Sequence, residues 1–353
     1  MNKMKLSGLI ATIATVLTIQ AQAGQESEPV GYFRTVIPGN SDGIVSAPIS
    51  DQIDFQDTVA GIAGNILTVS GTPFTAGAFT NGLSYVRFVS GPNAGLWSTI
   101  TSNTGSTLLL NAADPANLAT VAVGNRFVIA PHATLATVFP DGDAGTSFIA
   151  SLGTGGLQRR TEVILLDVTG QKQNRSGAAT YFFTAGFWRS TGATSVNADN
   201  TVLVPQRHFI LRNRNNTGAL TYRGTTTPYP WVLATSSLAG TNKNDNILAT
   251  GKLGQLTLDE LDLLGNDTFT PSTGTGGLAR RDELQIFNNG GAGFNKSAVA
   301  TYFVLTNGSW RSTANVNVDV SREPVIQSGA GLVIRRAAVA TTTNNVWSSA
   351  LSN

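Results

Sequence analysis

Short runs of alternating apolar and polar residues, separated by turn-forming residues, make up most of this chain. Residues 85–89, YVRFV, alternate with a period near two, which is typical of a half-buried strand. Clusters rich in Gly, Asn and Pro at 91–95 and of turn-forming residues at 103–106 separate such runs. The same pattern predicts strands at 44–50, 66–70, 85–90, 96–102 and 107–111. Strands this short predict a small antiparallel barrel or sandwich in this part of the chain.

An internal repeat organises the remainder. Residues 153–182 and 274–303 align without a gap at an offset of 121, and 15 of the 30 aligned positions are identical. After a one-residue shift the match resumes at Trp188 and Trp310, each followed by Arg-Ser-Thr. The extra residue falls near Asn307-Gly308, a pair that favours a tight hairpin turn. A length change confined to a turn predicts that 179–185 and 187–191 form antiparallel strands.

The repeat extends on both sides of this window. Upstream, Thr-Leu occurs at 134–135 and at 257–258, and Thr257 with Glu260 has the spacing of a capping box. This predicts one or two helical turns there. Downstream, residues 209–212, FILR, match residues 332–335, LVIR.

These patterns predict a mainly β protein. We expect a small N-terminal antiparallel barrel or sandwich, followed by two duplicated β-rich units, each with a short helix. The expected segments are a signal peptide at 1–23, an N-terminal β domain at 24–125, a first repeat unit at 126–240 and a second at 241–353.

The first residues have the features of a secretory signal peptide. Lys3 and Lys5 precede an apolar run at 6–19, and Ala21-Gln22-Ala23 is a small-residue cleavage motif. We expect a bacterial exported protein in the extracellular space, at the cell surface or in the periplasm. The chain contains no cysteine, so its stability outside the cytoplasm must come from its core and its paired strands.

Charge argues against a nucleic-acid partner. The chain has 23 basic and 21 acidic residues, and two of the lysines lie within residues 1–23, so the rest carries 21 of each. A nucleic-acid surface needs clustered positive charge. Charged residues make up 12% of the chain, about half the usual share of roughly 25%. No later apolar run reaches 18 residues, which predicts no transmembrane helix in the mature chain.

Residues 39–43, GNSDG, have the G-x-S-x-G spacing of a serine nucleophile elbow. That motif needs a strand, a sharp turn at the serine and then a helix. Here the continuation, 44–49, is IVSAPI, which is β-branched and favours a strand. The only histidines for a triad are His132 and His208. We therefore interpret the segment as a β-hairpin and assign no catalytic residue.

Two duplicated basic pairs, Arg159-Arg160 and Arg280-Arg281, are candidate ligand contacts. Arginine forks bind carboxylate or phosphate, and the preceding GTGG could add backbone N–H groups. The alternative is structural, because Glu162 and Glu283 follow the pairs at equal spacing. Ion-pair networks of this kind often resemble functional sites, and we favour the structural interpretation.

The duplicated tryptophans, Trp188 and Trp310, are the other candidate contacts. Exposed aromatic faces can stack on sugars, whereas a tryptophan at the start of a hairpin strand more often packs in a core. With the arginine pairs they make up our candidate ligand-binding set: Arg159, Arg160, Trp188, Arg280, Arg281 and Trp310.

Metal and cofactor signals are weak. The segments 141–143, DGD, and 242–245, NKND, offer oxygen ligands but do not fit a calcium loop. Zinc lacks a ligand set, since there are two isolated histidines and no cysteine. We predict no metal and no cofactor. The sequons at 174–176 and 295–297 recur through the duplication and carry little meaning in a bacterium.

Several segments resemble a family of exported, β-rich proteins from Verrucomicrobia-type bacteria. These are GYFRTVIPGNSDGIVSAPI at 31–49, SGPNAGLWSTITSNTGSTLLL at 90–110, GNRFVI at 124–129 and TLATVF at 134–139. The resemblance implies a β-rich exported protein and carries over no catalytic residues. The segment at 90–110 also resembles β modules of phage tail fibres, which implies a structural or attachment role.

The sequence thus favours a non-enzymatic exported protein with a structural, surface or adhesive role. Candidate partners are a cell-surface glycan or other copies of the chain. The alternative is a secreted glycan-binding protein or glycan hydrolase that uses the arginine pairs and the tryptophans.

Overall fold

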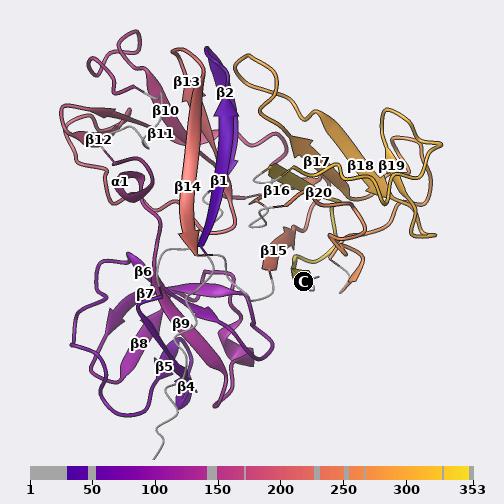
Figure 1. The fold of residues 1–353 in the computed structure, drawn as a ribbon. Helices are drawn as coiled ribbons and strands as arrows, with labels where there is room; N and C mark the ends of the chain where they lie inside the picture. The colour runs from indigo at the N-terminus through magenta and orange to yellow at the C-terminus, as the bar shows by residue number, and fades with distance from the viewer. Residues whose placement is uncertain are drawn as a thin grey trace, which may run out of the picture.

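The computed structural model describes residues 30–46, 53–140, 149–170, 172–225, 231–249, 254–265, 268–327 and 330–349. Strands account for 41% of residues and helices for 3%, which confirms the predicted mainly β class. Figure 1 shows three groups of strands: one at the bottom, one at the upper left and one at the right. The signal-peptide segment and the acidic segment at 141–143 lie outside the described residues.

The lower group is a seven-stranded antiparallel sheet in the order β3-β9-β6-β7-β8-β5-β4. Its strands confirm the alternation in the sequence, since Val86, Phe88, Ile100, Leu108 and Phe127 are all completely buried. A 3-10 turn, η1 (Leu118–Thr120), lies between β8 and β9 in the chain. The strands are β3 (Phe55–Thr58), β4 (Gly61–Ala63), β5 (Ile66–Thr68), β6 (Ser84–Phe88), β7 (Trp97–Asn103), β8 (Thr107–Leu110) and β9 (Arg126–Pro131).

The upper-left group, which we call unit 1, is a five-stranded antiparallel sheet in the order β12-β11-β10-β13-β2. The predicted hairpin is confirmed, because the second half of β11 pairs antiparallel with the whole of β12. A two-stranded ribbon, β1 with β14, lies beside the sheet (Figure 1). The strands are β1 (Val30–Ile37), β2 (Ser41–Ser46), β10 (Thr161–Leu166), β11 (Gly177–Thr184), β12 (Phe187–Ser190), β13 (His208–Asn213) and β14 (Gly218–Thr225).

The right-hand group, unit 2, repeats this plan. Its sheet has the order β16-β20-β17-β18-β19, and a ribbon of β15 with β21 accompanies it. The strands are β15 (Trp231–Ser237), β16 (Asn244–Ala249), β17 (Glu283–Phe287), β18 (Ala300–Val304), β19 (Trp310–Ser312), β20 (Gly331–Arg336) and β21 (Thr343–Ser349). Strand for strand, β1 and β2 therefore correspond to β15 and β16.

The repeat is thus longer than its sequence identity suggests. Residues 30–46 supply two strands of unit 1, and the seven-stranded sheet at 55–131 is inserted between β2 and the rest of that unit. The domain boundary expected at residue 125 does not follow these strand pairings. It groups β1 and β2 with the inserted sheet and separates β9 from its partners β3 and β6. These pairings join segments far apart in sequence, which local patterns do not reveal.

The hairpin predicted at the start of the chain is wrong, although both of its strands are present. β1 pairs with β14 and β2 pairs with β13, so the two strands belong to different sheets. Asn40 has a left-handed φ of 50°, and a Cβ on Gly39 would lie 2.6 Å from the Asn215 carbonyl oxygen. The close passage of the 215–216 backbone fixes this crossing, and the chain passes from one sheet to the other instead of folding back.

The predicted helical turns differ between the units. In unit 1, α1 (Leu135–Val138) begins with a capping box between Thr134 and Thr137. In unit 2, Thr257 and Glu260 make the capping-box contacts, with the Glu260 amide 3.1 Å from Thr257 Oγ1, but turns follow in place of an α-helix. Asp262 has a φ of 46°, which is incompatible with a continuing right-handed helix.

Candidate functional site

The first arginine of each duplicated pair lies in an ion pair. Arg159 Nη1 is 3.2 Å from Glu162 Oε1, and its guanidinium lies 5.6 Å from the centre of the Phe182 ring. In unit 2, Arg280 Nε is 3.6 Å from Glu283 Oε1. These contacts agree with the structural interpretation of the pairs.

The second arginine of each pair fixes the chain after the GTGGL loop. The amides of Arg160 and Arg281 each donate to a serine hydroxyl, Ser151 Oγ and Ser272 Oγ, at 3.1 Å. The two arginine pairs belong to different units, and neither of the two cavities described below is lined by any of these four residues.

The tryptophans do not offer a stacking surface. Trp188 and Trp310 are 1% and 2% exposed, and each lies in the hydrophobic core of its own unit. Trp188 Nε1 donates to the Phe139 carbonyl at 3.2 Å, and Trp310 packs on Phe269 with ring centres 5.3 Å apart. The prediction that these side chains contact a ligand is therefore corrected, because protein atoms cover both faces of each indole.

Ser41 does not form a nucleophile elbow. It begins strand β2, is fully buried, and its Oγ lies 3.2 Å from the Gly293 carbonyl oxygen. His208 pairs with Ser46 at the other end of β2, and His132 contacts Thr99 in the inserted sheet. The geometry supports no role in catalysis for this serine.

Sequence reasoning missed a reciprocal contact between the two units. The loop at 289–295 of unit 2 covers the free edge of β2. Asn289 acts like a neighbouring strand, since its Oδ1 accepts from the Ile44 amide at 2.7 Å and its Nδ2 donates to the Ile44 carbonyl at 3.0 Å. Next to it, the Asp42 amide donates to the Gly293 carbonyl at 2.9 Å.

The loop at 172–175 of unit 1 covers the edge of β16 in the corresponding way. The Asp245 amide donates to the Lys172 carbonyl at 2.9 Å, which matches the contact between Asp42 and Gly293. Arg175 Nε donates to the Asp245 carbonyl at 3.0 Å. Each unit thus covers the other's edge strand, as in the isologous interface of a symmetric dimer. We call the two contacts together the reciprocal clasp.

A buried carboxylate lies at the centre of each half of the clasp. Asp42 forms a two-pronged ion pair with Arg212, at 2.8 and 2.9 Å, and Asp245 forms the same pair with Arg335, at 2.7 and 2.9 Å. Both aspartate side chains are at most 3% exposed. The hydrogen bonds that Arg212 and Arg335 donate to these carboxylates raise the pKa of both guanidinium groups.

The sequon asparagines complete each half of the clasp. The Asn295 amide donates to Asp42 Oδ2 at 2.7 Å, and the Asn174 amide donates to Asp245 Oδ2 at 2.6 Å. Each asparagine has a φ of 53° and accepts from the arginine of the opposite unit. Their recurrence therefore reflects a contact between the units, and a signal was present in the sequence: Asp-x-Ile occurs at both 42–44 and 245–247.

Two adjoining cavities lie where the units meet, and of these two only the larger is also lined by the inserted sheet. The larger, about 530 Å³, is lined from all three parts, including Thr99, Asp114, Gln206, Arg207 and Ser236. We call it the polar chamber. The smaller, about 310 Å³, lies against β10, β11 and β13, and is lined mostly by apolar side chains. We call it the apolar chamber.

Comparison with protein-family models, with curated proteins and with solved structures finds no match. In the part of the chain that the structure describes, no group of three or more His, Cys, Asp and Glu could hold a metal ion. No helix among the described residues is long and apolar enough to cross a membrane.

Proposed function

We propose that this protein is an exported, non-enzymatic protein with a structural or adhesive role at the cell surface, in which the duplication provides two equivalent contact points. The observation that carries the proposal is a pair of matched, fully exposed leucines. Leu157 and Leu278 occupy the same position of the GTGGL loop in the two units, with 100% and 105% of their surface exposed.

Neither leucine is explained by the fold. The hydrophobic cores of the units do not include them, and a fully exposed leucine gains nothing from burial within its own chain. Both units nevertheless keep the side chain, together with the glycines before it. Two equal apolar points on one molecule suit a protein that binds two neighbours or a continuous surface, because linked contacts strengthen each other.

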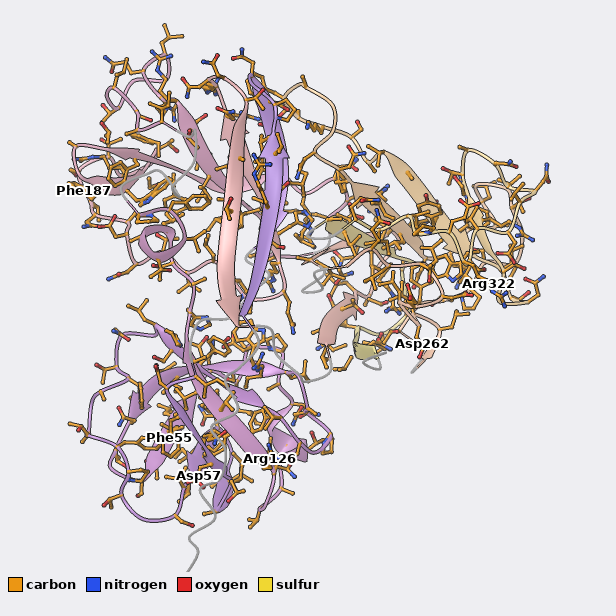
Figure 2. All side chains as sticks on the ribbon, viewed as in Figure 1. Phe55, Asp57, Arg126, Phe187, Asp262 and Arg322 are labelled. Atoms are coloured by element: carbon orange, nitrogen blue, oxygen red, sulfur yellow. The ribbon has the colours of Figure 1, made fainter. Side chains whose placement is uncertain are left out.

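The arrangement of the units supports the same role. The clasp covers the inner edges of both sheets, so β12 and β19 are the outer edges (Figure 1). Figure 2 shows Phe187, on β12, and Arg322, in unit 2, on opposite sides of the molecule. No observation favours the glycan alternative, since both tryptophans are buried and Arg159 and Arg280 are in ion pairs.

Fractionation of the producing cells tests the proposal. We expect the protein in the cell-surface fraction, and we expect the double variant Leu157→Ser, Leu278→Ser to move to the soluble fraction. Each single variant should retain part of the attachment. Arg322→Ser, at a 94% exposed side chain, is the control and should behave as the unchanged chain. Recovery of the unchanged chain only as a soluble monomer would overturn the proposal.

A further inference from the structure

Arg207 lies at the boundary between the two chambers. The chambers share five lining residues: Val168, Val202, Val204, Arg207 and Ile247. The chambers therefore adjoin, and the shared residues lie between the polar chamber and the apolar chamber. Their volumes of about 530 and 310 Å³ fall within or at the lower limit of the usual range for small-molecule sites, roughly 300–1,000 Å³.

The apolar chamber is built on the sheet of unit 1. Leu165, Leu166, Ala179, Tyr181 and Phe209 line it from strands β10, β11 and β13. The register of β10 with β11 shifts between Leu165 and Leu166, at the chamber wall. Bulges of this kind bend a strand and are common beside binding sites. The small side chain of Ala179 leaves room where a larger one would fill the space.

Arg207 brings a positive charge without a direct partner among the described residues to this boundary. Its side chain is half-buried, and within the described residues its guanidinium has neither a hydrogen bond nor an ion pair. Burial lowers the pKa of Arg207; the charge of Asp114 offsets this only in part, and the nearby charge of Arg175 lowers the pKa further. A guanidinium in this setting binds carboxylate or phosphate strongly, through two parallel hydrogen bonds.

The two acids that line the polar chamber, Asp114 and Asp245, each contact another partner. Asp114 Oδ2 accepts from the Thr99 amide at 2.6 Å, and Asp245 is bound by Arg335 within the clasp. Among the described residues neither carboxylate makes a hydrogen bond or an ion pair with Arg207, and Asp114 acts on it only through its charge. Gln206 and Ser236 add neutral polar side chains to the polar chamber, where an anionic head group could accept further hydrogen bonds.

We propose that the two chambers bind a single-chain amphiphile, with its anionic head group at Arg207 and its apolar tail in the apolar chamber. A carboxylate and a phosphate are equivalent head groups for this chemistry. The site is independent of the exposed leucines, so the surface role and amphiphile binding can each fail without the other. It also explains why a polar and an apolar cavity meet at an arginine without a partner.

Titration calorimetry of the full chain with sodium decanoate tests this site. We expect saturable binding with a stoichiometry of one. Acetate, which lacks the tail, and decanol, which lacks the charge, should each bind at least about tenfold more weakly, because each loses one of the two contacts. Decyl phosphate should bind like decanoate. Equal binding of acetate and decanoate, or no binding of decanoate, would overturn the proposal.

Two substitutions separate the head contact from the tail contact. Arg207→Gln should weaken decanoate binding about tenfold or more, and Ala179→Leu should do so by filling the apolar chamber. Arg322→Gln is the matched control and should leave binding unchanged. If Ala179→Leu fails to fold, Val204→Phe narrows the same space. Binding unaffected by Arg207→Gln would contradict the assignment of the head group.

Vesicles distinguish a free amphiphile from a membrane lipid. The space suits one chain, so we expect no sedimentation of the protein with vesicles of phosphatidylglycerol and phosphatidylcholine that depends on Arg207. Sedimentation that Arg207→Gln abolishes, in the absence of decanoate binding, would assign Arg207 to a membrane surface and overturn the site.

Discussion

Two aspartates connect the units through single, well-defined side chains. Asp42 and Asp245 are each buried, each paired with an arginine of the same sheet, and each bound by an asparagine amide from the opposite unit. A buried carboxylate costs several kcal/mol to desolvate, so its stability depends on keeping every one of these partners. The clasp is therefore sensitive to the loss of either aspartate.

Asp42→Ala should lower the free energy of unfolding by about 3–5 kcal/mol, since it leaves Arg212 half-buried without its counter-ion. Urea unfolding measures this change. Asp259→Ala provides the comparison, because Asp259 pairs with Arg322 on the surface and should cost at most about 1 kcal/mol. Equal effects of the two substitutions would contradict the central place of Asp42.

The two histidines predict how stability changes with pH. Burial lowers the pKa of both His132 and His208 to about 4, and the His208 Nδ1–H donates to the Leu248 carbonyl at 2.7 Å. The unfolded chain, with a pKa near 6.5, therefore binds protons that the folded chain does not. The contribution of the two neutral histidines to the free energy of unfolding is complete above pH ~6.5 and is lost as the pH falls toward about 4.

Each histidine should thus contribute about 2 kcal/mol of destabilisation between pH 7.5 and pH 5. Urea unfolding at the two pH values measures the change. His132→Gln removes one of the two titrating groups and should reduce the difference between the two pH values. A difference as large in His132→Gln as in the unchanged chain would show that His132 does not contribute.

At the scale of strands, the clasp protects two sheet edges. β2 and β16 end their sheets on the inner side, and an unprotected edge offers free N–H and C=O groups to other chains. The loop at 289–295 fills these positions on β2, where Asn289 replaces a strand neighbour for Ile44. The edges are therefore covered by loops from the other unit.

Asn289→Asp should leave the Ile44 amide bonded but remove the donor to the Ile44 carbonyl. We expect faster hydrogen exchange for the amides of 41–46 and little change for β10, in the middle of the same sheet. Mass spectrometry of peptides from both strands makes the comparison within one sample. Unchanged exchange in 41–46 would mean that Asn289 does not protect this edge.

Strands and local turns were predictable from the sequence, whereas most of their partners were not. Alternation and turn residues located β5 to β8, and the repeat located the hairpin of β11 and β12. The opening strands were also expected, but their pairing with β13 and β14 joins segments about 160–195 residues apart. Nothing in residues 30–46 specifies that separation, so the hairpin prediction failed there.

For the candidate site residues, too, contacts between residues close in sequence were predictable and contacts between distant segments were not. The glutamates near Arg159 and Arg280 revealed their ion pairs, because those partners lie three residues away. Burial of Trp188 and Trp310 was the favoured interpretation, and the structure agrees with it. The clasp and Arg207 depend on residues brought together from distant segments, and only the repeated Asp-x-Ile pattern hinted at the clasp.

For the whole molecule, the duplication produces one interlocked pair with a third sheet inserted into it. The inserted sheet contributes a wall to the polar chamber. In the chain, segments of unit 1 both precede and follow this sheet. Each unit supplies a loop that the other needs, so the stability of the two units should be coupled. The proposed surface role depends on this coupling, because it needs both exposed leucines on one assembled molecule.

Hydrogen exchange across the clasp tests this coupling between the units. Asp42→Asn, in unit 1, should accelerate exchange in the loop at 289–295 of unit 2 and spare the loop at 172–175. Asp245→Asn, in unit 2, should have the reverse effect. Mass spectrometry of both loops in both variants gives the answer in one experiment. Loops that exchange equally in the unchanged chain and in both variants would show that the units do not clasp each other.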